Sequence, residues 1–186
     1  MRLLLLVREG SRSAGAFLLV FLALFSAAAI WGGCGDQHAD ASQPQLANTF
    51  ESPEAVSRAV LAALEAEDYE KLRRYALSEE EFSSIVWPEL PSSRPDRNLP
   101  LSYVWGDLNH KASSSLGRLV ERQGGKHYDL VRVEFEGVIT PYDSFRVYRD
   151  ARLVVRDELG KEKPVDFFGS IIERNGRFKL FSYYVD

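Results

Sequence analysis

The sequence predicts an α+β domain in which helices come first and antiparallel strands follow. Apolar residues recur at helical spacing from residue 53 to residue 122, and apolar and polar residues then alternate from residue 131 to residue 185. The dipeptide Asn175-Gly176 separates the last two alternating segments. It is typical of a tight β-hairpin, because both central positions of a type I′ turn need a positive φ. We therefore expect N-terminal helices packed on a four-stranded antiparallel meander sheet.

Each expected helix except the last has a polar residue at its start. The first helix begins after Ser52, which can cap it, and the Pro and Glu that follow suit the first helical turn. Asp68 can cap a second short helix, and Ser78 with Glu81 has the spacing of a capping box that opens a third. We expect Glu81 and the two glutamates before it to be solvated. A fourth helix is expected from Leu101 to about Arg122, after a proline-rich surface loop.

The second half of the chain has the period of β-strands. The four expected strands are residues 131–136, 145–156, 165–173 and 178–185. Because side chains alternate along a strand, one face of this sheet should pack on the helices while the other meets water. The residues expected to be buried against the first helix are Val131, Val133, Phe135, Leu153 and Val155.

The order of these elements resembles that of a known superfamily. The resemblance is carried by two or three short N-terminal helices, by the segment AALEAEDYEKLRRYAL and by long strands that end in FFGSIIERNGRFKLFSYYVD. In these features residues 50–186 resemble the nuclear-transport-factor-2-like superfamily. The resemblance implies a curved sheet wrapped around the helices as a cone with a pocket. It rests on order and pattern and includes no catalytic signature.

Composition and charge exclude several classes of protein. The 186 residues are 45% hydrophobic and 27% charged, as in an ordinary globular chain, which excludes a mainly disordered protein and a polytopic membrane protein. Beyond residue 33 the chain carries 20 basic and 26 acidic side chains. An acidic surface repels phosphate backbones, so nucleic-acid binding is not expected. A single cysteine excludes an internal disulfide and a multi-cysteine zinc site.

The first 33 residues are typical of a secretory signal peptide. A basic start precedes an apolar run at residues 14–30, and two glycines precede Cys34. This order resembles a bacterial lipoprotein signal, which implies that Cys34 is lipidated and becomes the mature N-terminus; Trp31 stands where that signal usually has an aliphatic residue. Residues 34–50 then form the lipidated cysteine and a flexible tether, and residues 51–186 form one domain. The alternative is an uncleaved membrane anchor.

The expected location follows from this leader. The protein would be attached to a membrane of the bacterial cell envelope through the lipid on Cys34, with its domain facing the periplasm or the exterior.

A search for chemistry finds few candidates. The chain has no nucleophile motif, no phosphate-binding loop and no paired histidines, so no cofactor and no metal are expected. Arg149 falls in the apolar register of its strand and would reach the pocket, unless a bulge turns it outward. Asp166 is a candidate pocket acid and His127 a candidate acid or base, although both positions also suit a solvent-exposed side chain.

Aromatic residues on the last strand suggest an interface. Phe178 and Tyr184 lie on one face of this strand, and Phe181 and Tyr183 lie on the other. A strand that is apolar on both sides is either buried on both sides or covers a partner. Phe181 and Tyr183 are therefore candidates for contact with a protein partner or with a second copy in a homodimer.

Two hypotheses for function follow. The one we favour is an envelope lipoprotein whose domain binds a small apolar ligand of unknown identity, or a protein partner, without catalysis. The alternative is an enzyme similar to the isomerases or dehydratases of the same superfamily. Such an enzyme would need a carboxylate or histidine deep in the cone, with its pKa tuned by burial.

Overall fold

The structure, a computed structural model, describes residues 44–183 and has the α+β class that the sequence predicts. The α-helices are α1 (Pro53–Glu65), α2 (Tyr69–Tyr75), α3 (Glu79–Glu81) and α4 (Leu101–Gln123). A π-helical turn (Phe82–Val86) and 3₁₀ turns (Trp87–Glu89, Pro91–Ser93 and Pro95–Arg97) connect α3 to α4. The strands are β1 (Tyr128–Phe135), β2 (Thr140–Pro141), β3 (Arg146–Tyr148), β4 (Ala151–Asp157), β5 (Glu162–Val165), β6 (Ser170–Arg174) and β7 (Arg177–Ser182).

The helix starts agree with the sequence. The side chain of Ser52 accepts a hydrogen bond from the backbone of Ala55, and Asp68 caps α2 in the same way. Ser78 and Glu81 form the predicted capping box at α3. These starts were predictable because each cap is made between residues three positions apart.

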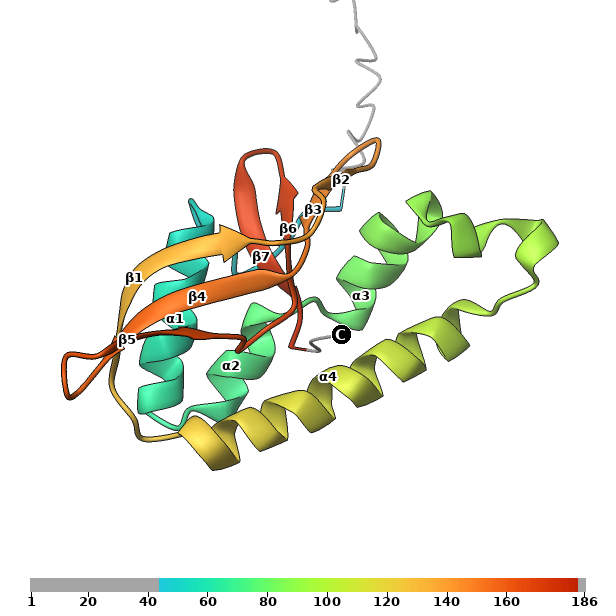
Figure 1. The fold of residues 1–186 in the computed structure, drawn as a ribbon. Coiled ribbons are helices and arrows are strands. Elements are labelled where there is room, and N and C mark those ends of the chain that lie inside the picture. The colour runs from blue at the N-terminus through green and yellow to red at the C-terminus, as the bar shows by residue number, and fades with distance from the viewer. Residues whose placement is uncertain (1–43, 184–186) are drawn as a thin grey trace, which may run out of the picture. The chain divides into compact units, whose positions relative to one another are not determined.

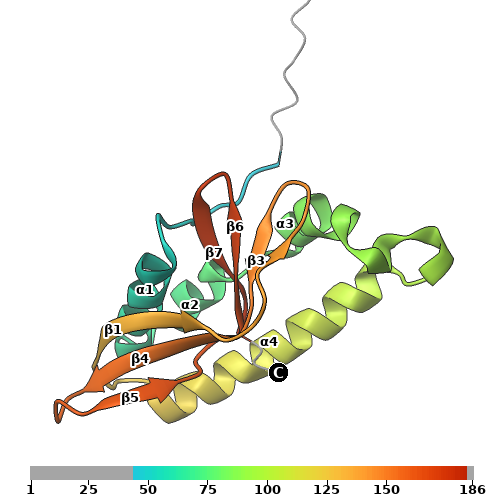
Figure 2. The same ribbon diagram turned by 45° about the horizontal axis from the view of Figure 1, so that its top comes forward.

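The strands form two antiparallel sheets, so the predicted single four-stranded meander is wrong. One sheet has the order β1-β4-β5 and the other has the order β2-β3-β6-β7. Figures 1 and 2 show the strands of the first sheet running across those of the second. Asp150 has a φ of 53° and interrupts the strand predicted over 145–156, so that β3 joins one sheet and β4 the other. Residues 166–169, which belong to no strand, likewise divide the segment predicted over 165–173, so that β5 joins the first sheet and β6 the second.

A bulge in β1 changes which side chains face the core. In its pairing with β4 the register shifts between Leu130 and Arg132, so Val131 is the extra residue. Val131 is consequently 37% exposed, and its predicted burial is wrong. Leu130 and Val133 are partly buried against the core instead, and Leu153 of β4 is fully buried as predicted.

The core consists of two clusters. The larger lies between α1, α2 and the strands, and its buried members include Val56, Val60, Leu64, Leu72, Leu153, Val155, Phe168, Ile171 and Leu180. The smaller lies between the α3 region and the four-stranded sheet, and its buried members include Phe82, Ile85, Val86, Phe145, Val147 and Ile172. The N-terminal half of α4 packs on the smaller cluster through Val104, Trp105 and Leu108.

Residues 44–50 lie on the domain, and we call them the N-terminal strap. The tether predicted over 34–50 is therefore not free in this part. Phe50 exchanges two backbone hydrogen bonds with Phe178 of β7, at 2.8 and 2.9 Å, and Leu46 packs against the smaller core cluster. The strap adds backbone pairing and apolar contacts to the edge of β7, which the α2–α3 link also meets through a parallel bridge between Ala76 and Leu180.

The predicted signal peptide and Cys34 lie outside the described residues. Within residues 44–183, no helix combines the length and the apolar character that crossing a bilayer requires.

Candidate functional site

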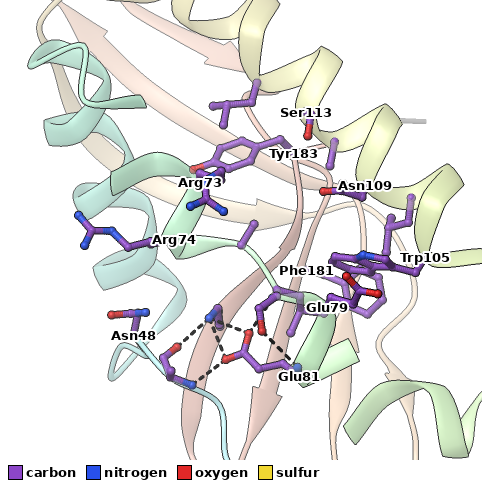
Figure 3. Close-up of a pocket in the computed structure, with 18 residues that line it drawn as sticks. Asn48, Arg73, Arg74, Glu79, Glu81, Trp105, Asn109, Ser113, Phe181 and Tyr183 are labelled. Carbon is purple, nitrogen blue, oxygen red and sulfur yellow. Dashed lines mark hydrogen bonds and ion pairs between the residues drawn. The ribbon is translucent and has the colours of Figure 1, made fainter. Parts of the chain in front are cut away.

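A groove lies between α4 and the surface formed by α2, the α2–α3 link and β7 (Figure 3). Its volume is about 350 Å³, within the range of about 300–1,000 Å³ that is usual for ligand sites. The groove has an apolar and aromatic floor, formed by Ala76, Leu77, Trp105, Leu108, Ala112, Leu116, Phe181 and Tyr183. Such a floor suits the apolar body of a small molecule.

Polar side chains form the rim of this groove. Figure 3 shows Arg73 of α2 beside Tyr183, whereas Arg74 points away from the opening. Asn109 and Ser113 face it from α4. The rim thus supplies a cation and neutral hydrogen-bonding groups around an apolar interior.

A buried ion pair closes the strap side of the groove. Lys179 Nζ lies 2.9 Å from both carboxylate oxygens of Glu81, and their side chains are only 2% and 7% exposed. The ammonium also donates to the backbone carbonyl of Ala47 at 2.9 Å. Glu81 in turn accepts from the backbone N–H of Ala47 at 2.7 Å and of Ser78 at 2.8 Å. The pair therefore joins β7, α3 and the strap.

Neither member of this pair was expected to be buried. Glu81 was expected to be solvated, and the structure buries it, while Glu79 and Glu80 are exposed. The pair had one signal in the sequence, since Lys179 interrupts an otherwise apolar run in β7. A charge in such a run needs a partner, but the sequence does not say which of the many carboxylates provides it.

The two residues predicted to form an interface pack mainly within the domain. Tyr183 is 2% exposed, and its hydroxyl donates to the backbone carbonyl of Leu72 at 2.8 Å. Burial raises the pKa of Tyr183 well above its ordinary value, because the phenolate would lose its hydration. Phe181 is half-buried against the smaller cluster and lines the groove. The assignment of Tyr183 to an exposed partner surface is therefore wrong.

Two of the predicted pocket residues lie on the surface. Arg149 is exposed, and its Nε donates to Thr140 Oγ1 at 3.1 Å, because the irregular backbone at Asp150 turns it away from the core. Asp166 is also exposed and pairs with Arg152 at 3.0 Å. Asp166 borders a second cavity, beside the C-terminal half of α4, but neither residue lines the groove described above.

His127 lies at the start of β1, away from the groove. Its Nδ1 is 2.9 Å from Glu65 Oε2, and its Nε2 is 3.4 Å from Asp129 Oδ1. The hydrogen bond and charge of Glu65, helped by Asp129, raise the pKa of this exposed imidazole above 6.5. Among residues 44–183, no three His, Cys, Asp or Glu side chains come together as a metal site.

Comparisons with known protein families, with curated proteins and with solved structures give no match to this chain.

Proposed function

We propose that this chain is a lipid-anchored protein of the bacterial cell envelope whose α+β domain binds a small, largely apolar ligand without catalysis. The observation that carries the binding function is the groove, in which an aromatic and aliphatic floor is surrounded by a few polar side chains. Binding sites for small molecules commonly combine these two features.

Binding is favoured over acid–base catalysis by the state of the ionisable groups in the groove. Lys179 and Glu81 are buried there, but each is already satisfied by the other and by backbone groups. A general acid or base must instead reach the reacting atom of its substrate. The candidates proposed for the enzyme alternative, His127 and Asp166, do not line this groove.

The proposal also includes the lipid anchor and the relationship of the fold to a known superfamily. The anchor rests on the order of basic start, apolar run, paired glycines and Cys34. We also propose that the two crossing sheets and their helices correspond to the cone of the nuclear-transport-factor-2-like superfamily, with the groove as its pocket. The helices-first order and the antiparallel pairing of the strands support this relationship.

A groove-filling variant tests the binding site. Ala112 lines the groove from α4, so Ala112→Trp should occupy part of its volume. The described residues 44–183 lie within one compact unit, so a fragment of residues 41–186 would be purified and titrated with the neutral fluorescent probe phenylnaphthylamine. We expect Ala112→Trp to weaken probe binding about tenfold. Ala62→Trp is the matched control, because Ala62 is exposed on α1 and does not line the groove. Equal binding by both variants would contradict the proposed site.

The anchor has a separate test. Cys34→Ser should leave the domain folded while abolishing acyl-chain labelling and cleavage of the leader. Mass spectrometry of the native protein should find the lipid on Cys34. Detection of an unmodified Cys34 still joined to Gly33 would contradict the lipoprotein proposal and would support an uncleaved anchor.

A further inference from the structure

We propose that the ligand of the groove is a fatty acid, a single acyl chain with one carboxylate end, which enters from the membrane that carries the proposed anchor. The inference rests on the proposed function and names its ligand class. Three observations support it. Apolar and polar side chains line different parts of the groove, the groove is long enough for an acyl chain, and it lies next to the strap.

The groove separates an apolar interior from a polar opening. Leu116 and Tyr183, in its floor, are each 2% exposed, while Arg73, Asn109 and Ser113 on its rim are exposed. A ligand that fits both parts has an apolar chain and one polar end. A wholly polar molecule would leave the floor without matching contacts and would itself lose hydration.

The charges around the groove favour an anion at one end of its opening. Lys179 already neutralises Glu81, so neither is available to a ligand. Arg73 pairs with Glu70 at 3.1 Å, but the two side chains are 62% and 66% exposed. An exposed pair of this kind contributes little, so Arg73 can exchange Glu70 for a ligand carboxylate at small cost. Glu79 also lines the groove and disfavours an anion near its own side.

The dimensions fit one acyl chain. The groove follows α4 from Trp105 to Leu116, which corresponds to about 16 Å at the helical rise of about 1.5 Å per residue. One leaflet contributes about half of a hydrocarbon core about 30 Å thick, so a membrane acyl chain has a similar length. The volume of about 350 Å³ lies at the lower end of the usual range for ligand sites, which suits a single acyl chain.

Part of the groove wall belongs to the strap. Ala47 and Asn48 line the groove, and Ala47 follows Cys34, the proposed site of the lipid, by thirteen residues. Thirteen residues span at most about 45 Å even when fully extended. A lipid on Cys34 would therefore keep the groove within about this distance of the bilayer, which supplies fatty acids.

Photolabelling of the full-length lipoprotein tests this proposal. The protein would be reconstituted in phosphatidylcholine vesicles with dodecanoic acid that carries a diazirine on its chain. After irradiation, we expect labelled peptides to contain groove residues such as Trp105, Leu108 or Phe181. Ala112→Trp should reduce this labelling about tenfold, whereas Ala62→Trp should not change it.

The charge requirement is tested with the same protein. Arg73→Gln should lower labelling by the acid about threefold and leave labelling by the matching uncharged dodecanol probe unchanged. The control is Arg58→Gln, an exposed arginine on α1 that does not line the groove. Label confined to residues outside the groove, or equal effects of Arg73→Gln on both probes, would overturn the fatty-acid proposal. If phenylnaphthylamine still binds in the groove in that case, the proposed binding function stands and only the ligand class is wrong.

Discussion

Replacement of Lys179 by Met should destabilise the domain by about 3 kcal/mol. Met keeps the apolar stem of the lysine but removes the ammonium that lies 2.9 Å from the buried carboxylate of Glu81. Removal of one partner from a buried ion pair usually costs about 3–5 kcal/mol, because the other charge stays buried without compensation. Two backbone N–H groups, from Ala47 and Ser78, continue to donate to Glu81, so we expect the lower end of that range.

A double-mutant cycle isolates the interaction. Glu81→Gln alone should cost a similar amount, because it leaves the ammonium of Lys179 buried without its counter-charge. The double variant should lose about 2 kcal/mol less than the sum of the two single variants. Free energies of unfolding would be measured by urea denaturation of residues 41–186. Single losses under about 1 kcal/mol, or strict additivity, would refute the role given to this pair.

Two further predictions concern the core and the effect of pH. Leu153→Ala should lower the free energy of unfolding by about 2–5 kcal/mol, because Leu153 is fully buried between the sheet and α1. Val131→Ala, on the exposed bulge, should change it by less than about 0.5 kcal/mol. Similar losses for the two variants in chemical denaturation would show that the orientation of β1 is wrong. The raised pKa of His127 means that its pairing with Glu65 stabilises the folded state fully below pH 6.5 and loses this effect as the pH rises through the folded-state value. His127→Asn should therefore destabilise the domain more at about pH 5.5 than at about pH 8.5, and an equal effect at both would contradict the pairing.

The helices were predictable because their signals are local. Ser52, Asp68 and Ser78 each accept a hydrogen bond from a residue three positions later, which the sequence displays directly. The β6–β7 turn was predictable for the same reason. Asn175 and Gly176 have φ values of 53° and 72°, as the Asn-Gly dipeptide indicates.

The division into two sheets depends on contacts between distant segments. Gly137 approaches residues 149–150 so closely that a Cβ there would lie 2.7 Å from Arg149 Cβ. Alternation of apolar residues does not reveal this approach or the left-handed backbone of Asp150. It also does not reveal the extra residue at Val131, because a bulge reverses the inward face without changing the composition of the strand.

The groove was the least predictable part of the structure. Its floor combines residues from the α2–α3 link, from α4 and from the end of β7, so no short motif displays it. Glu81 stands in a run of three glutamates, a pattern that is typical of a solvated helix start, and its partner Lys179 is 98 residues away. The sequence did indicate that the last strand is apolar on both sides, but it left open whether the domain or a partner covers it.

The buried pair also affects the order in which the protein can fold. A growing chain emerges N-terminal end first, so the strap and α3 exist long before β7 is made. Lys179 lies 132 residues after Ala47, and until it arrives the strap has no ammonium to hold it. Closure of the strap over β7 must therefore be a late event, governed by contacts of long sequence separation. A chain stalled before residue 179 would contain every α-helix of the described domain, but its N-terminal strap would still lack the hydrogen bond from Lys179 to Ala47.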